Sequence, residues 1–216
     1  MDRFSHVQRW LTLATWLAVC GLLSCSSPAS IAGIKVTGPV SLLDLFPQAR
    51  KKTEASGELQ RKVRIIKINL DGKPERALFL HPKSEVIFPL RIEGAAVLET
   101  AIALRPEAWE KEGDGVTFYI AVRRQDEYLP TYVYSRHLYP QLFEEHRGWQ
   151  PVSIDLTPFQ DTDFELILGT DPGPAFNPGY DWAVWKDPRL YNPATDADWV
   201  SPEQPKPRSR PQGSRF

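Results

Sequence analysis

The feature that most constrains this chain is a series of short segments in which apolar side chains fall on every second residue. In one of them, Val116, Phe118, Ile120 and Val122 are separated by single residues of other types. An extended strand sends successive side chains to opposite faces, so this spacing predicts a strand with one buried face. Eight further short apolar runs are spaced along the chain, at residues 63–70, 76–81, 85–92, 96–104, 131–135, 152–156, 164–169 and 182–185.

The residues between these runs predict how the strands connect. Gly, Pro and Asp residues separate the runs, which is typical of an all-β antiparallel sandwich or barrel. No segment has a long helical period, and this argues against a parallel α/β fold. Pro89 lies inside one run and cannot donate a backbone hydrogen bond, so we expect that strand to be an edge strand or to be bulged there.

The flanking segments differ from this region in composition. Residues 26–60 mix Ser, Pro, Gly and basic residues, and we interpret them as a linker or tether. Residues 61–200 are assigned to the sandwich. Residues 201–216 contain four prolines and four basic residues with almost nothing apolar to bury, which predicts a flexible, disordered tail.

The N-terminal residues 1–25 have the pattern of a secretory leader. Arg3 and Arg9 precede an uncharged run over residues 10–23, which is short for a membrane span. Leu22, Ser24 and Cys25 resemble a bacterial lipobox, whose cysteine is lipidated and becomes the mature N-terminus. That resemblance predicts an exported protein, lipid-anchored in the bacterial cell envelope through Cys25, with Ser26 favouring the outer membrane. An ordinary cleaved signal peptide and an uncleaved anchor are the alternatives.

Several kinds of chemistry lack support in the sequence. Cys20 and Cys25 are the two cysteines and both lie in the leader, so the domain has no disulfide, thiolate metal site or cysteine nucleophile. His81, His137 and His146 lie far apart and form no zinc-binding motif. A net charge of −1 gives no basic excess, and we therefore expect no nucleic-acid partner.

Acidic residues leave one catalytic alternative open. A glycosidase needs two carboxylates about 5–10 Å apart, which can come from any part of the chain. Acidic residues in turns and at strand ends are also ordinary, so we predict that the chain is not an enzyme and keep a two-carboxylate hydrolase as the weaker alternative. The candidates are Asp114, Asp155, Asp163, Asp171 and Asp181.

Aromatic residues are the positive functional signal. An exposed ring gives a flat apolar surface for the C–H face of a sugar, although a core of this size also needs large side chains. Trp182 and Trp185 are three residues apart, so an extended strand sends them to opposite faces. The predicted ligand-binding residues are Tyr128, Tyr132, Tyr134, Trp149 and Trp182.

The order of motifs resembles the jelly-roll carbohydrate-binding modules attached to bacterial glycosidases and cell-surface proteins. The resemblance covers about residues 64–191 and rests on the runs 77–82, 98–104, 113–118, 149–156, 166–170 and 181–188, with Asp-Gly-Val-x-Phe at residues 114–118 and Asp-x-Ala-x-Trp at residues 181–185. It implies a jelly-roll sandwich in which Asp114, Asp181 and Trp185 are structural. It also implies that Asp181 either binds a structural calcium ion or caps backbone amides.

These observations lead to three hypotheses. The first is an envelope-anchored, non-catalytic lipoprotein whose sandwich binds a glycan and requires no cofactor beyond a possible structural calcium. The second is an interaction or scaffolding lipoprotein that docks on an envelope protein complex, with the basic proline-rich tail as a recognition segment. The third is the two-carboxylate hydrolase.

Overall fold

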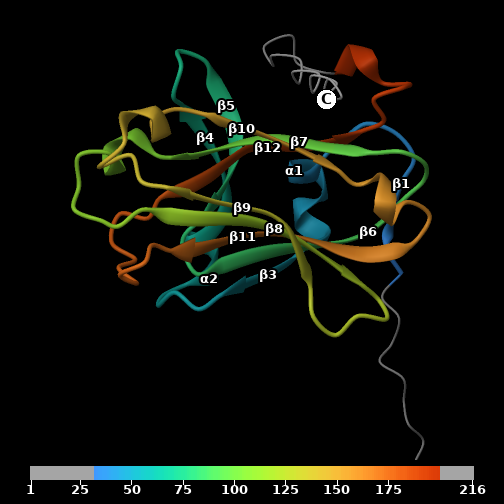
Figure 1. Ribbon diagram of the computed structural model, residues 1–216, viewed down its shortest axis with the longest axis horizontal. Coiled ribbons are helices and arrows are strands. Elements are labelled where there is room, and N and C mark those ends of the chain that lie inside the picture. Colours follow the sequence, from blue (N-terminus) through green and yellow to red (C-terminus); the bar gives the residue numbers. More distant parts are fainter. Residues whose placement is uncertain (1–31, 200–216) are drawn as a thin grey trace, which may run out of the picture. The chain divides into compact units, whose positions relative to one another are not determined.

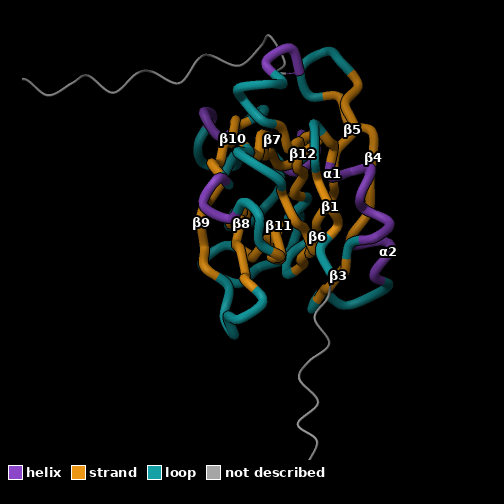
Figure 2. Tube along the Cα trace, turned by 90° about the vertical axis from the view of Figure 1, so that its right-hand side faces the viewer, coloured by secondary structure: helices purple, strands orange, loops and turns teal. Residues whose placement is uncertain are grey.

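The computed structural model describes residues 32–199, which form two β-sheets packed face to face (Figure 1). In sheet A the strand order is β1 (Ile34–Val36), β6 (Ser84–Ile92), β11 (Asp163–Pro172), β8 (Val116–Arg124) and β9 (Thr131–Leu138), with β3 (Arg50–Thr53) also beside β6. In sheet B the order is β10 (Gln150–Asp155), β7 (Val97–Leu104), β12 (Ala183–Tyr191), β5 (Pro74–Leu80) and β4 (Val63–Asn69), with β2 (Val40–Ser41) also beside β12. Figure 2 shows the two sheets as two rows of strands.

The chain crosses repeatedly between the sheets, as in a jelly roll. β6 lies in sheet A, β7 in sheet B, β8 and β9 in sheet A, β10 in sheet B, β11 in sheet A and β12 in sheet B. The strand pairs are antiparallel except for β1 with β6, which is parallel. The predicted all-β antiparallel sandwich is therefore confirmed.

In the described part of the chain, helical structure is confined to single turns. The α-helical turns are α1 (Leu42–Leu45) and α2 (Leu59–Lys62), and the 3-10 turns are η1 (Phe46–Gln48), η2 (Pro106–Ala108), η3 (Glu144–His146), η4 (Thr157–Phe159) and η5 (Ala197–Trp199). Within residues 32–199, no helix is long and apolar enough to cross a membrane.

The core lies between the sheets and follows the two-residue alternation. The inward residues of β8 are fully buried, and Phe118 meets Trp185 of β12 edge to face with ring centroids 5.4 Å apart. Each large apolar side chain buried in this way stabilises the fold by about 1.5–3 kcal/mol. Trp185 is thus a core residue, whereas Trp182 lies on the outer face of sheet B.

The expected tether over residues 26–60 is corrected for residues 34–53, which belong to the sandwich. They supply β1 and β3 to sheet A, β2 to sheet B, and two buried leucines of α1, Leu42 and Leu43. These strands are too short or too polar to show an apolar alternation. They join the sheets through backbone pairing, which does not require one. A Cβ atom at Gly33 would lie 2.4 Å from the carbonyl carbon of Leu90, so the close approach beside β6 needs a glycine.

The prediction that Pro89 marks an edge strand or a bulge is wrong. β6 is an interior strand, and its register with β11 runs through Pro89 without a shift. On the other side of β6, β3 pairs as far as Ile87 and β1 pairs from Leu90 onward. Pro89 therefore falls in the gap between two partner strands, where no backbone donor is required.

The predicted leader with Cys25 and the predicted tail at residues 201–216 lie outside the described residues.

Candidate functional site

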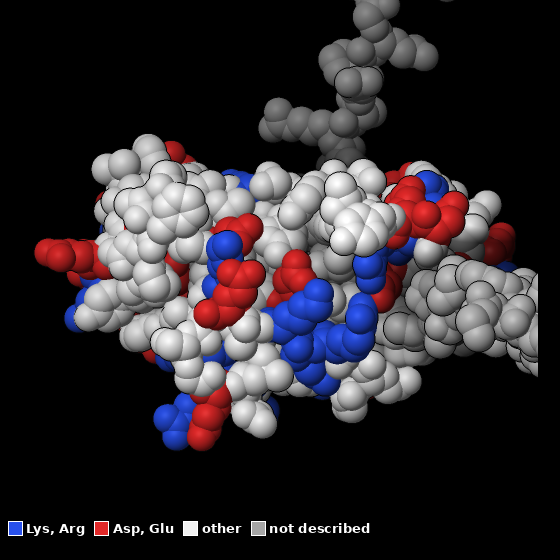
Figure 3. Space-filling model, turned by 90° about the horizontal axis from the view of Figure 1, so that it is seen from below, with Lys and Arg blue, Asp and Glu red and all other residues white. Residues whose placement is uncertain are grey.

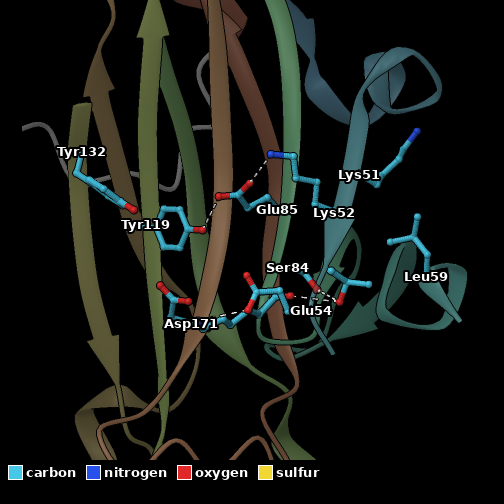
Figure 4. Close-up of a pocket in the computed structure, with 11 residues that line it drawn as sticks. Lys51, Lys52, Glu54, Leu59, Ser84, Glu85, Tyr119, Tyr132 and Asp171 are labelled. Atoms are coloured by element: carbon cyan, nitrogen blue, oxygen red, sulfur yellow. Dashed lines mark hydrogen bonds and ion pairs between the residues drawn. The ribbon is translucent and has the colours of Figure 1, made fainter. Parts of the chain in front are cut away.

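The outer face of sheet A carries a groove of about 850 Å³ (Figure 4). We call it the sheet A groove and define it by Lys52, Glu85, Tyr119, Tyr132 and Asp171, which come from β3, β6, β8, β9 and β11. These residues are far apart in the sequence, and the register of sheet A brings them together on one face.

Tyr119 forms the floor of this groove. Its ring lies over Gly169 of the neighbouring strand β11, where an added Cβ atom would come within 2.1 Å of the ring. The Tyr119 hydroxyl donates a hydrogen bond of 2.9 Å to Glu85 Oε1. Burial raises the pKa of Tyr119, and the nearby Glu85 carboxylate raises it further, so this phenol stays protonated at neutral pH.

Tyr132 forms a wall of the groove because β9 contains a bulge. Tyr132 pairs with Ala121 but Tyr134 pairs with Ile120, so Val133 is one extra residue in β9. Tyr132 consequently points outward, is 61% exposed and meets Tyr119 edge to face with ring centroids 5.3 Å apart. Tyr134 turns inward and packs against the core.

Charged groups of both signs line the groove in equal number. The amines belong to Lys51, Lys52 and Lys83, and the carboxylates to Glu54, Glu85 and Asp171. Lys52 lies 3.8 Å from Glu85 and Lys83 lies 3.4 Å from Glu54. These groups can donate and accept hydrogen bonds with a polar ligand while leaving the groove close to neutral.

Asp171 is the most perturbed of these carboxyl groups. Its burial raises its pKa, with the charges of Glu54 and Glu85 adding to the effect and Lys83 opposing it. A carboxyl group with a raised pKa beside other carboxylates is a feature shared by binding sites and by acid catalysts.

A second charged region of the same face is already engaged in ion pairs. Arg50 and Arg123 both contact Glu165, and Arg91 lies 3.5 Å from Asp163. Figure 3 views the molecule from the side of sheet A and shows Lys and Arg side chains gathered with Asp and Glu beside them.

The outer face of sheet B carries a separate groove of about 740 Å³. We call it the sheet B groove and define it by Arg64, Phe79, Arg105 and Trp182. Phe79 and Trp182 belong to an apolar cluster on this face, which also includes Trp149.

The five aromatic residues predicted to bind ligand do not share one platform. Tyr132 lines the sheet A groove, while Trp149 and Trp182 lie on the outer face of sheet B. Tyr128 is 91% exposed in the loop between β8 and β9, and Tyr134 is half-buried against the core. The bulge and the two-residue alternation cause this dispersal.

A buried cluster of oxygen atoms lies around Asp181. Asp181 is fully buried, and neither of its carboxylate oxygens has a hydrogen-bond partner. Burial raises the pKa of Asp181 to about 8, with the nearby Asp114 carboxylate contributing. Oδ1 of Asp114 and Oε1 of Gln141 are also buried without a partner, whereas Oδ2 of Asp114 accepts a hydrogen bond from the Ala175 amide.

This oxygen set can be tested against the calcium ion expected at Asp181. Ca²⁺ takes six to eight oxygen ligands from carboxylates, amide carbonyls and water. An added Cβ at Gly113 would lie 3.2 Å from the Gln141 amide nitrogen and 3.4 Å from the Gly179 carbonyl oxygen, so Gln141 and the loop before Asp181 meet beside Asp114. The described residues contain no group of three or more His, Cys, Asp or Glu side chains arranged for a metal. The four unpartnered oxygens of Asp181, Asp114 and Gln141 would supply part of the ligand set of a hard cation. Asp181 accepts no backbone amide, which disfavours the capping alternative.

The other acidic candidates have local roles. Asp155 accepts a hydrogen bond from the Thr157 amide. Asp163 accepts one from the Gly33 amide and pairs with Arg91. The five aspartates therefore occupy four separate places, with Asp114 and Asp181 together.

Sequence reasoning missed most of the residues that the structure places in these sites. They are Lys52, Glu85 and Tyr119 in the sheet A groove, Arg64, Phe79 and Arg105 in the sheet B groove, and Gln141 near Asp114. Tyr119 and Glu85 stand on outward positions of their strands, and Gln141 lies in a loop. The outward position of Tyr119 in an otherwise apolar strand is the one signal that could have identified it.

Comparisons with known proteins give a limited picture. No protein-family profile matches the chain. An uncharacterized protein of Archaeoglobus fulgidus is 36% identical over 120 residues, which cover 52% of this chain and 30% of that relative. The chain thus spans about a third of the relative's length.

The solved structures similar to the chain include carbohydrate-binding modules. One is the CBM51-2 module with INT domains of Clostridium perfringens ZmpB in complex with GlcNAc, with 21% identity, coverage of 71% of this chain and 31% of that chain, and a TM-score of 0.47. Another is the CBM51 of Clostridium perfringens GH95 in complex with methyl-galactose, with 17% identity, coverage of 70% and 99%, and a TM-score of 0.44. The tandem CBM51 modules of a family 98 glycoside hydrolase from Streptococcus pneumoniae SP3-BS71 give 14% identity, coverage of 72% and 47%, and a TM-score of 0.48. Because all three TM-scores are below 0.5, these likenesses carry no conclusion about the ligand of this chain.

Proposed function

We propose that this chain is a non-catalytic glycan-binding module that holds a neutral sugar in the sheet A groove. The observation that carries the proposal is the exposed Tyr132 ring beside Tyr119, in a groove lined by three amines and three carboxylates. The ring faces supply an apolar surface for sugar C–H groups. The amines and carboxylates supply donors and acceptors for hydroxyl groups.

The size of the groove suits such a ligand. Its volume of about 850 Å³ falls within the range of about 300–1,000 Å³ that is usual for ligand sites. The equal number of cations and anions favours an uncharged, polyhydroxylated ligand over an ionic one. A charged ligand would be attracted by one set of these groups and repelled by the other.

A pair of tyrosine variants of the full chain tests this proposal. Tyr132→Ala removes the groove wall, whereas Tyr128→Ala removes an equally large ring from the adjacent loop. In calorimetric titrations with neutral oligosaccharides selected on a glycan array, we expect Tyr132→Ala to weaken binding about tenfold, or about 1.4 kcal/mol. Tyr128→Ala should bind like the unmodified chain. Equal losses in both variants, or retention of no neutral glycan by the unmodified chain, would contradict the proposal.

A hydrolase is the second candidate, and Asp171 is the observation that favours it. The raised pKa of Asp171 would suit a general acid, and Glu54 or Glu85 would supply the second carboxylate of a glycosidase. Incubation of the full chain with the oligosaccharide that it binds separates the two candidates. New reducing ends that disappear in Asp171→Asn would establish cleavage and refute the non-catalytic proposal.

Calcium binding at Asp181 is a further part of the proposal. Asp181, Asp114 and Gln141 would hold the ion with their unpartnered oxygens. Asp114 precedes β8 of sheet A and Asp181 precedes β12 of sheet B, so the ion would join the two sheets at one end.

Display at the bacterial cell envelope through a lipid on Cys25 completes the proposal, and the lipobox-like sequence supports it. Metabolic labelling with a fatty-acid analogue should mark the full chain and not Cys25→Ser. Docking on an envelope protein is the alternative role. Recovery of one protein partner by both the unmodified chain and Tyr132→Ala, with no glycan retained by either, would favour that role.

A further inference from the structure

The sheet B groove combines an aromatic floor with basic walls. Arg64 stands directly across from Phe79 in the β4–β5 pair, and its guanidinium carbon lies 4.5 Å from the Phe79 ring centroid. The Arg105 guanidinium lies 5.4 Å from the Trp182 ring centroid. The Arg105 amide donates a hydrogen bond of 3.0 Å to the Trp182 carbonyl, which holds the two residues side by side.

Both arginines are pre-positioned by these contacts. A guanidinium group over an aromatic ring gains a cation–π interaction, and stacking leaves the N–H groups at its edge able to bind other groups. The edge of a guanidinium matches the two oxygens of a carboxylate in a bidentate pair. Arg64 also donates to the Arg61 carbonyl, which further limits its motion.

The charge around this groove is strongly positive. Its lining includes four cationic residues, Arg61, Lys62, Arg64 and Arg105, against one carboxylate, Glu58. Glu58 pairs with Arg61 at 3.2 Å, and both side chains are mostly exposed. Glu107, outside the lining, pairs with Arg105. Among residues 32–199, no carboxylate forms an ion pair with Lys62 or Arg64.

His81 adds no charge to this surface at neutral pH. Its burial lowers its pKa, with Lys62 contributing, and its ring contacts the Pro82 carbonyl at 2.8 Å. The excess of positive charge thus resides on the arginines and on Lys62, which line the groove together with Trp182.

We infer that the sheet B groove is a second binding site, for a saccharide that carries a carboxylate, such as a uronic-acid residue. The sugar ring packs against Trp182 beside the Arg105 guanidinium. Its carboxylate binds the N–H groups of Arg64 and Arg105 that are not used in the bonds to the Arg61 carbonyl and to Glu107. A neutral sugar leaves Lys62 and Arg64 without an anion, and a free inorganic anion leaves the aromatic floor uncovered. The groove therefore favours a ligand that carries both a sugar ring and a carboxylate. This site is separate from the sheet A groove and does not depend on it.

Titration of the full chain with an oligogalacturonate tests this site, with its carboxyl-reduced neutral counterpart as the reference probe. The test variant is Arg64→Gln/Arg105→Gln. Arg50→Gln/Arg91→Gln is the matched control, because it removes two charges of the same kind from the outer face of sheet A. We expect the unmodified chain and the control to prefer the oligogalacturonate at least about tenfold, and the test variant to lose that preference. An equal loss in the control, or no preference in the unmodified chain, would overturn the inference.

A spectroscopic measurement keeps the test decisive if the double variant does not fold. Oligogalacturonate should shift the indole N–H resonance of Trp182 in the unmodified chain, with the resonance assigned by Trp182→Phe. Acetate and inorganic phosphate at the same carboxylate or anion concentration should not reproduce the shift. An unmoved Trp182 resonance, or equal shifts with the free anions, would overturn the saccharide site. Loss of neutral-sugar binding in Tyr132→Ala should leave the shift of the Trp182 resonance unchanged. The proposals for the two grooves can therefore be refuted separately.

Discussion

The two outer faces of the sandwich both offer an aromatic floor, but they differ in charge. The sheet A groove matches three amines with three carboxylates, whereas the sheet B groove sets four cations against one carboxylate. In the sheet A groove, the protonated Tyr119 hydroxyl bonds the Glu85 carboxylate. In the sheet B groove, the Phe79 and Trp182 rings lie next to guanidinium groups. Under the two proposals, the ring provides a common platform and the balance of charge selects the class of ligand.

The comparison would fail if a single perturbation changed both outer faces together. The largest effect of this kind is expected at Asp181, because its titration changes the stability of the whole fold. In the presence of a chelator, the stability of the unmodified chain should fall as the pH rises from about 4 to about 8. The pKa of Asp181 is raised from 3.8 to about 8, so the folded state retains a proton that the unfolded chain has released. Each pH unit in this window lowers the free energy of unfolding by about 1.4 kcal/mol. Urea denaturation at pH 5 and pH 8 measures the fall, and an equal fall in Asp181→Asn would contradict it.

Calcium should offset part of that loss, and this is the next largest effect. At about 100 times its Kd, a ligand of the folded state stabilises it by about 2.7 kcal/mol, which raises the Tm of a domain of this size by roughly 6–10 °C. We expect this rise when calcium is added at pH 8 to the chelator-treated full chain, and not in Asp181→Asn. A rise of the same size in Asp181→Asn would exclude the oxygen cluster as the site.

A glycine substitution should separate the two faces. In Gly169→Ala the new Cβ overlaps the Tyr119 ring and forces it away from Glu85. Overpacking of this kind costs about 1–3 kcal/mol, and we expect neutral-sugar binding to weaken while binding of oligogalacturonate is unchanged. Gly38→Ala is the matched control, because no atom lies within 4 Å of its added Cβ. Loss of binding at both grooves would show that they are not independent.

Salt should produce the smallest effect and should sharpen the contrast. Raising the ionic strength from about 0.05 M to about 0.5 M screens exposed charges, so binding of oligogalacturonate should weaken by roughly 0.5–1 kcal/mol. Neutral-sugar binding in the sheet A groove should change little. Calorimetric titrations at the two salt concentrations measure both, and an equal response of the two ligands would argue against the assignment of ligand classes.

The sequence predicted the part of the fold that depends on local alternation. Each of the nine strands β4–β12 contains an apolar run that located it, and several of these runs alternate with period two. For β12 the predicted run 182–185 covered only the first part of the strand. β1, β2 and β3 have three, two and four residues, and β3 consists of Arg50, Lys51, Lys52 and Thr53. Their place in the sheets depends on backbone pairing with β6 and β12, which leaves no mark on composition.

The grooves could not be predicted for a related reason. Residues 51–54 and Leu59 line the sheet A groove, while residues 56–58 and 60–62 line the sheet B groove. The segment interpreted as a tether therefore contributes to both sites. Each groove also joins strands that are adjacent only in the folded sheets, such as β6, β8 and β11, and no spacing along the chain encodes that proximity.

Because of the bulge in β9, the position of Tyr132 in the sheet A groove depends on the number of residues in that strand. If Val133 were absent, Tyr132 would occupy the place opposite Ile120 or leave its present pairing, and the face that each tyrosine presents would change without any change in side-chain type. Two homologous chains could then align tyrosine with tyrosine and still display different surfaces. When relatives of this chain are aligned, a one-residue gap between β8 and the end of β9 is more informative about the groove than identity at either tyrosine.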